Sequence, residues 1–121
     1  MEIFKDFTFD SAHFLPNVPD GHKCKRMHGH TYKVRICLKG DLDPHLGWVK
    51  DFGDIKNIWK PVELMLDHYL LNDIEGLDNP TAELIAVWIW RKMQKDLPQL
   101  IRVEVFETPT SCAIYRGEFE A

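Results

Sequence analysis

The chain has 121 residues, of which 45% are hydrophobic and 28% are charged, and its net charge is −4. These values are typical of one globular domain covering residues 1–121, and they exclude a fibrous or disordered protein. The acidic balance argues against a general nucleic-acid-binding surface, and no apolar run approaches the roughly 18 residues of a membrane span. Three widely spaced cysteines and a start without a signal-peptide pattern predict a cytoplasmic protein with no membrane or nucleic-acid partner.

Two strands are predicted in the first forty residues. Residues 3–14 place Phe9 and His13 at one parity, which is typical of a strand with one buried face. Proline and glycine make residues 15–27 a predicted loop. Residues 28–39 then alternate between apolar or aromatic positions and charged ones, which predicts a half-buried strand.

Two helices are predicted in the middle of the chain. From about residue 51 to residue 66, apolar side chains recur with the spacing of an amphipathic helix. Pro61 lies inside this pattern and predicts a kink or a restart. After a predicted loop, a second helix is expected to begin near Asn79 or Thr81, either of which can cap it, and to run to about Lys95.

The chain ends with two more predicted strands, over residues 100–108 and 112–116. The order is therefore ββααββ. It predicts an α+β fold, in which a four-stranded antiparallel sheet carries both helices on one face. The other face of the sheet would be open, and its scattered apolar residues favour a homo-oligomer.

The tripeptide His28-Gly29-His30 is the most informative local motif. On a strand, residues i and i+2 point to the same side, so both imidazoles can reach one ion. His13 lies near the end of the neighbouring predicted strand and can join them if the two strands form a hairpin. Three neutral imidazoles suit zinc and leave a fourth position open for chemistry. The spacing alone does not decide between this site and ordinary strand histidines.

Cys24 precedes His28 by four residues and has three interpretations. It can be a fourth metal ligand, an inert loop thiol, or a base or nucleophile whose thiolate form is favoured by Lys23, Lys25 and Arg26. The same basic residues form either a solvated loop or the rim of a pocket that attracts an anionic, phosphorylated substrate. Residue type leaves these alternatives open.

Asp67 and His68 follow the first predicted helix and could act together in proton transfer, or they could be a surface carboxylate beside a helix-end histidine. The apolar residues around them predict partial burial. Glu107 shares the parity of an apolar strand face. It either accepts paired N–H donors from a heterocycle or turns to solvent. Cys37 and Cys112 are predicted to be packing residues.

Several motifs, in this order and over nearly the whole chain, resemble the 6-pyruvoyltetrahydropterin synthase superfamily. Within it, the chain is most similar to the bacterial 6-carboxytetrahydropterin synthases of queuosine biosynthesis. The matching motifs are Phe9-Asp10-Ser11-Ala12-His13, Cys24-x-x-x-His28-Gly29-His30, Gly47-Trp48-Val49-x-Asp51-Phe52, Leu66-Asp67-His68, Asn79-Pro80-Thr81-x-Glu83, Glu107-Thr108 and Ile114-Tyr115-Arg116-Gly117. The three residues between Cys24 and His28 match the queuosine branch, and the animal enzymes have a longer stretch there.

The resemblance implies a T-fold that assembles into a barrel-like homo-oligomer, a hexamer, with active sites at subunit interfaces. It implies that three histidines bind Zn²⁺, that a cysteine accepts a proton, and that an Asp-His pair is the second acid or base. A glutamate would anchor the pterin, with two further residues near the pocket. The implied zinc ligands are His13, His28 and His30, and the implied catalytic and substrate residues are Cys24, Asp67, His68, Glu107, Thr81 and Glu83.

The implied substrate is 7,8-dihydroneopterin triphosphate. The implied products are 6-carboxy-5,6,7,8-tetrahydropterin, acetaldehyde and triphosphate, formed by a zinc-dependent carbon–carbon lyase. Two alternatives stay open. One is a 6-pyruvoyltetrahydropterin synthase, which eliminates triphosphate without carbon–carbon cleavage. The other is a zinc- or pterin-binding protein without catalysis.

Overall fold

The computed structural model describes residues 1–121 and contains four strands and two α-helices. The predicted order ββααββ is confirmed, and the predicted ends differ from the observed ones by a few residues at most. The elements are β1 (Glu2–His13), β2 (His28–Lys39), α1 (Phe52–Leu66), α2 (Ala82–Met93), β3 (Leu100–Thr108) and β4 (Ser111–Tyr115), with short 3₁₀ turns at Lys23–Lys25 and Leu71–Asp73.

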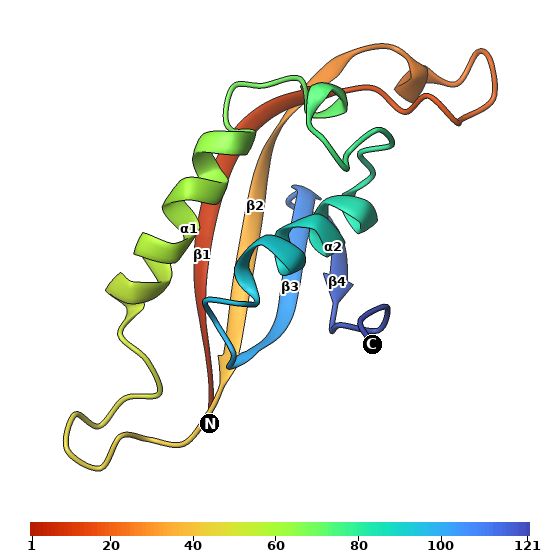
Figure 1. Ribbon diagram of the computed structural model, residues 1–121. Coiled ribbons are helices and arrows are strands. Elements are labelled where there is room, and N and C mark those ends of the chain that lie inside the picture. Colours follow the sequence, from red (N-terminus) through yellow and green to blue (C-terminus); the bar gives the residue numbers. More distant parts are fainter.

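The four strands form one antiparallel sheet in the order β1-β2-β3-β4. Both helices lie on the same face of this sheet. Helix α1 runs beside β1, and α2 crosses in front of β2 and β3 (Figure 1). The long connection from β1 to β2 extends beyond one end of the sheet, and the connection from β2 to α1 extends beyond the other. The predicted two-layer arrangement is therefore confirmed.

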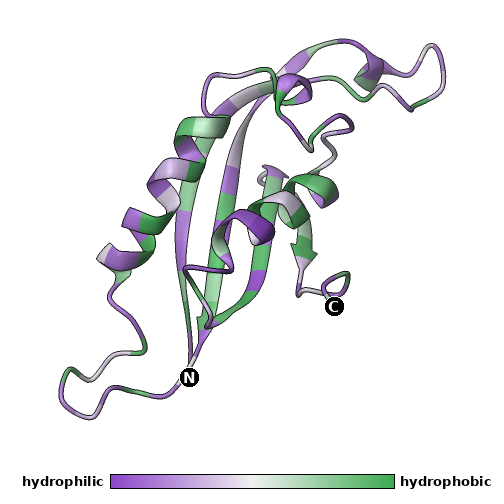
Figure 2. Ribbon diagram, in the orientation of Figure 1, coloured by the Kyte–Doolittle hydropathy of each residue, from purple (hydrophilic) through white to green (hydrophobic).

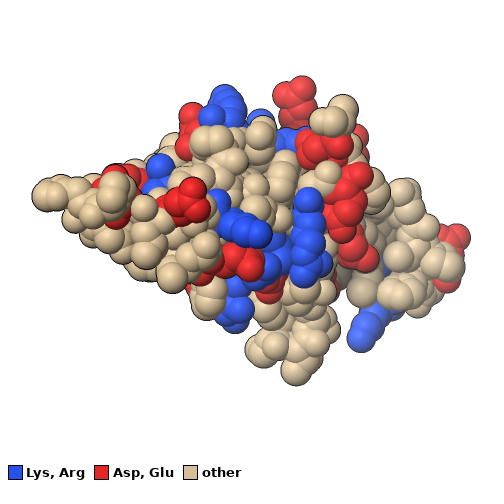
Figure 3. Space-filling model, turned by 90° about the horizontal axis from the view of Figure 1, so that it is seen from below, with Lys and Arg blue, Asp and Glu red and all other residues tan.

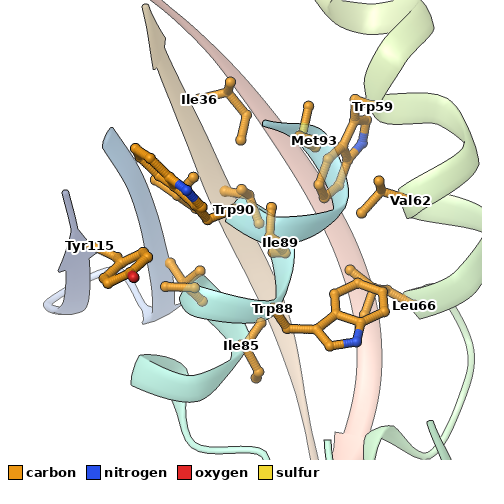
Figure 4. Packing of buried hydrophobic residues seen from close by; sticks show 14 of the residues in the cluster. Ile36, Trp59, Val62, Leu66, Ile85, Trp88, Ile89, Trp90, Met93 and Tyr115 are labelled. Atoms are coloured by element: carbon orange, nitrogen blue, oxygen red, sulfur yellow. The ribbon is translucent and has the colours of Figure 1, made fainter. Parts of the chain in front are cut away.

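The core lies between the sheet and the helices, because alternate residues of each strand point to opposite faces. On β2, Tyr32, Val34 and Ile36 are fully buried, while the charged residues between them face away. Figure 2 shows this alternation as changing colour along the strands. Figure 4 shows how α1 contributes Trp59, and α2 contributes Trp88 and Trp90, to the same cluster.

Helix α1 does not restart at Pro61, so this half of the sequence prediction is wrong, while a kink there stays a prediction. The helix is continuous from Phe52 to Leu66, with Asp51 capping its start by accepting a hydrogen bond from the Gly53 N–H at 2.8 Å. Pro61 cannot donate to the carbonyl of Asn57, but both residues lie on the exposed side of the helix. Water can satisfy that carbonyl, so the helix loses one hydrogen bond without leaving a buried polar group unpaired.

The open face of the sheet is polar and carries pairs of opposite charge. Arg35 makes two hydrogen bonds to Asp6, and Arg102 bridges to Glu104 at 2.6 Å. Cys37 is buried beneath this layer, as predicted for a packing residue. Cys112 is exposed, so its predicted packing role is wrong. It lies on the edge strand β4, beyond which no further strand covers it.

Charged side chains of both signs also meet at one end of the molecule. In the view of Figure 3, Lys and Arg side chains lie directly beside Asp and Glu side chains rather than forming a field of one sign. Neither helix is long and apolar enough to cross a membrane.

Candidate metal centre and active site

Three histidines converge where β1 ends and β2 begins. His13 is the last residue of β1 and pairs with His28, the first residue of β2, while His30 pairs with Ser11. The three rings contact one another edge-on, with centroids between 4.5 and 5.1 Å apart. The strand register therefore brings together the three side chains that the sequence predicted to converge.

The hydrogen bonds of the two paired histidines favour a cation between them. His13 Nδ1 lies 2.8 Å from the carbonyl oxygen of Pro80, and His28 Nδ1 lies 2.8 Å from that of Arg26. Because a carbonyl only accepts, both Nδ1 atoms carry the proton, and both Nε2 atoms of the neutral rings present lone pairs. These two Nε2 atoms face each other at 2.9 Å. Two lone pairs at that distance repel each other unless a cation binds both.

His30 completes the cluster with an unsatisfied nitrogen. Its Nε2 is buried and has no hydrogen-bond partner, although the Glu107 carboxylate lies 3.4 Å away. Candidate ligand atoms of all three histidines lie within 4.8 Å of one another. Burial lowers the pKa of both His13 and His30, which keeps the imidazoles in the neutral form that binds metal. The residues present therefore fit Zn²⁺, a cation that three imidazoles suit.

Cys24 lies beside this cluster but is not one of its ligand atoms. It lines a pocket of about 410 Å³ with His28, His30 and Glu107. The group of ligand atoms within 4.8 Å consists of the three histidines, and two of them, His28 and His30, border the pocket that contains the Cys24 thiol. Lys23 lines the same pocket, whereas Lys25 binds Asp20 at 2.5 Å and forms part of the surface loop.

His68 lines a different pocket from Cys24, and Asp67 precedes it in the chain. Asp67 ends α1, and its Oδ2 accepts a hydrogen bond from His68 Nδ1 at 2.8 Å. This carboxylate raises the pKa of His68. The partial burial predicted for this pair is confirmed for Asp67 and wrong for His68, whose side chain is 79% exposed. The segment after α1 runs along the outside of β1, where nothing in the same chain covers it.

Comparison with known proteins identifies the family of this chain. A model of the 6-pyruvoyl tetrahydropterin synthase family matches residues 2–118. The chain belongs to that family. It is 44% identical to the 6-carboxy-5,6,7,8-tetrahydropterin synthase of Synechocystis, over 93% of this chain and 91% of the relative. It is 37% identical to the enzyme of the same name from Bacillus subtilis, over 95% of this chain and 84% of the relative.

A solved structure supports the same assignment. The 6-pyruvoyl tetrahydropterin synthase of Caenorhabditis elegans superposes with a TM-score of 0.90 at 27% identity, covering 98% of this chain and 96% of that one. The predicted T-fold, a four-stranded antiparallel sheet with two helices, is thereby confirmed. The histidine cluster in this family member is consistent with a metal site.

The remaining predicted residues of this family member lie at the start of α2. Thr81 caps the helix, and its hydroxyl accepts a hydrogen bond from the Leu84 N–H at 3.1 Å. Glu83 lines a smaller pocket together with Glu107 and Cys112. Glu107 therefore borders both this pocket and the one that contains Cys24. That position suits a residue that anchors one end of a bound molecule.

Sequence reasoning missed two kinds of residue that shape the site. The carbonyls of Pro80 and Arg26 orient the histidine rings, and no side-chain pattern indicates a main-chain contact of this kind. The sequence gives Asp10 no predicted role of its own, yet its backbone binds both Asp67 and His68. The sequence did hold one signal for Asp10: it is a carboxylate on the open-face side of β1, three residues before the predicted metal ligand His13.

Proposed function

We propose that this chain is a zinc-dependent carbon–carbon lyase of queuosine biosynthesis. It converts 7,8-dihydroneopterin triphosphate to 6-carboxy-5,6,7,8-tetrahydropterin, acetaldehyde and triphosphate. The observation that carries the proposal is the histidine cluster with paired Nε2 atoms at 2.9 Å, open toward a pocket that contains a thiol. Relatives that share 44% and 37% of its residues carry the name of this activity.

His13, His28 and His30 would hold the zinc ion, which when bound acts as a Lewis acid toward substrate oxygens. Glu107 would accept the amino-amide edge of the pterin, since a carboxylate can take two parallel N–H donors. Thr81 and Glu83 lie at the adjacent helix start and would border the pterin. Lys23, in the pocket of Cys24, would attract the triphosphate.

Cys24 would be the base that removes a proton from the substrate side chain. Its pocket places it beside His28 and His30 without occupying the metal-ligand positions. Lys23 and a bound cation would both favour the thiolate form. Asp67 would orient His68, whose Nδ1 donates to it, and His68 would return a proton to the substrate through its other nitrogen.

Cys24 and His68 line different pockets of one chain, so we propose that a second subunit supplies the missing partner. A homo-oligomer, a hexamer as the family resemblance implies, would bring His68 of one subunit beside Cys24 of another. The high exposure of His68 and the open face of the sheet support this arrangement. Co-expression of Cys24→Ala and His68→Gln chains tests it, because mixed oligomers regain activity only if each site draws on two subunits.

The decisive experiment incubates zinc-loaded protein with 7,8-dihydroneopterin triphosphate and identifies the products by mass. Acetaldehyde together with 6-carboxytetrahydropterin supports the proposal. A 6-pyruvoyl product without acetaldehyde would instead support the activity named for the Caenorhabditis elegans structure.

Cys24→Ala is the matched variant for catalysis. Its expected turnover is lower by a factor of about 100 or more, the usual size of a general-base contribution, with zinc content unchanged. Unchanged turnover in this variant would contradict the role of Cys24. No product with the wild-type protein would leave a zinc- or pterin-binding protein as the better description.

A further inference from the structure

A second pocket borders the histidine cluster through His30, at the edge of the sheet that β1 forms. It has a volume of about 570 Å³ and is lined by the ends of β1 and β2 and by the segment that follows α1. His68 contributes its imidazole to this pocket, and Asp10 of β1 contributes a carboxylate. The proposed reaction uses His68 there but gives no role to Asp10.

The backbone of Asp10 holds the Asp67–His68 pair at the edge of the sheet. Its N–H donates to Asp67 Oδ1 at 2.8 Å, and its carbonyl accepts from the His68 N–H at 2.6 Å. Both groups are available because Asp10 and Thr31 form a non-hydrogen-bonded pair of the β1–β2 ladder, so the backbone of Asp10 points outward. One residue of β1 therefore fixes both members of the acid–base pair.

The side chain of Asp10 is held separately from its backbone. Its Oδ1 accepts a hydrogen bond from the Thr31 hydroxyl at 2.5 Å. Side chains approach most closely at non-hydrogen-bonded pairs of an antiparallel ladder, which explains this cross-strand contact. The hydroxyl orients the carboxylate, which lines the same pocket as the imidazole of His68.

The backbone of His68 is itself unusual, with a φ of 64° in the left-handed region. A non-glycine residue persists there only when its surroundings fix it, and the hydrogen bond to Asp10 does so. Asp67 raises the pKa of His68 most, and Asp10 raises it further. Two titratable groups flank His68 in the chain, Asp67 and Tyr69. Asp10 of β1 and His30 of β2 line the same pocket. Lys60 of α1 is the nearby cation, and it lowers the pKa of Asp67.

We propose that Asp10 is a positioning residue for this acid–base pair. Its backbone fixes Asp67 and His68 against the edge of β1, and its carboxylate adds a second negative charge that holds His68 in the cationic, proton-donating form. The inference rests on the proposed function, because it takes His68 to be the residue that donates a proton to the substrate.

The variant Asp10→Asn tests this role. It keeps both backbone bonds and an oxygen that can accept from Thr31, but it removes the charge. We expect a lower pKa of His68, measured by NMR titration of its ring protons and assigned with His68→Gln. The high-pH limb of kcat/KM for dihydroneopterin triphosphate should move to lower pH. Above the pKa of His68, activity should fall about two- to fivefold, as expected for an exposed charge pair.

Asp41→Asn is the matched control, because it removes the same charge from an exposed loop. It should leave both the pKa of His68 and the pH profile unchanged. An unchanged pKa in Asp10→Asn overturns the inference. A lower pKa with an unmoved pH profile supports the effect of Asp10 on His68 and contradicts the proposed role of His68 as the acid. If Asp10→Asn does not fold, Asp10→Ser replaces it with the same expectations, since it also lacks the charge and keeps a hydroxyl beside Thr31.

Discussion

The two faces of the sheet are built from the same strands but differ in their surroundings, since helices cover one face and leave the other open. On the covered face, alternate residues pack under α1 and α2, and the histidine cluster continues this packing to the end of the sheet. On the open face, Asp10 and Thr31 border a pocket next to an exposed His68. The covered face brings together three histidines that are consistent with a metal site, whereas the sheet edge at β1 carries a His68 side chain that one chain leaves exposed.

Removing a ligand from the covered face should have the largest effect. His13 is fully buried, so His13→Ala leaves the other two imidazoles to hold the ion with no replacement from solvent. We expect loss of stoichiometric zinc and a fall in turnover of about 1000-fold, the size of the Lewis-acid contribution. Metal analysis after gel filtration, together with product formation, checks both. His45→Ala, in an exposed loop, is the control, and full zinc content in His13→Ala would contradict the assignment.

Two aromatic-to-alanine variants compare how much a side chain on each face contributes to the free energy of unfolding. Trp59 is 1% exposed and stacks on Phe7 at 5.0 Å, so Trp59→Ala should lower the free energy of unfolding by about 3–5 kcal/mol. Phe4, on the open face, is 48% exposed beneath Arg35 at 3.9 Å. Phe4→Ala should cost less than about 1 kcal/mol in an isolated chain. Urea unfolding gives both values. Phe4→Ala could instead lower the free energy of unfolding as much as Trp59→Ala does, but only at high protein concentration. That result would show that another subunit covers this face.

Removal of metal should destabilise the folded chain through the histidine cluster of the covered face. A ligand that binds only the folded state adds about 2.7 kcal/mol when present at 100 times its dissociation constant. Chelation should therefore lower the melting temperature, and added zinc should restore it. His28→Ala, which lacks one ligand, should melt at the same temperature with and without zinc. Equal sensitivity to chelation in the wild type and in His28→Ala would contradict the cluster as the site of this stabilisation.

The same division explains what the sequence could predict. Alternation along β2 placed His28 and His30 on the covered face, and parity along β3 placed Glu107 beside them, because a regular strand fixes where each side chain points. The exposure of His68 could not be predicted in this way. It depends on the path of an irregular segment along β1, which is set by backbone hydrogen bonds to Asp10 and leaves no periodic signal.

The predictions of a helix restart at Pro61 and of a packing role for Cys112 were wrong for related reasons. The sequence shows that Pro61 lies within a helical pattern, but not that the carbonyl it leaves unpaired faces water. It shows that Cys112 begins a strand, but not that this strand is the sheet edge. Local periodicity therefore indicated the elements and the strand face that carries the histidines, while solvent exposure at turns and edges followed from tertiary arrangement.

A small effect is also expected at the helix start that borders the covered-face site. Thr81 caps α2, and the preceding Pro80 carbonyl holds His13 Nδ1. Thr81→Ala should lower the free energy of unfolding by about 1 kcal/mol, the usual value of a lost N-cap, and Thr81→Ser should restore it. Thermal melts of the metal-free protein measure this without the contribution of zinc. If Thr81→Ala instead raises KM for dihydroneopterin triphosphate while stability stays at the wild-type value, the hydroxyl acts on the substrate. The covered face would then contact the substrate through α2 as well as through the strands.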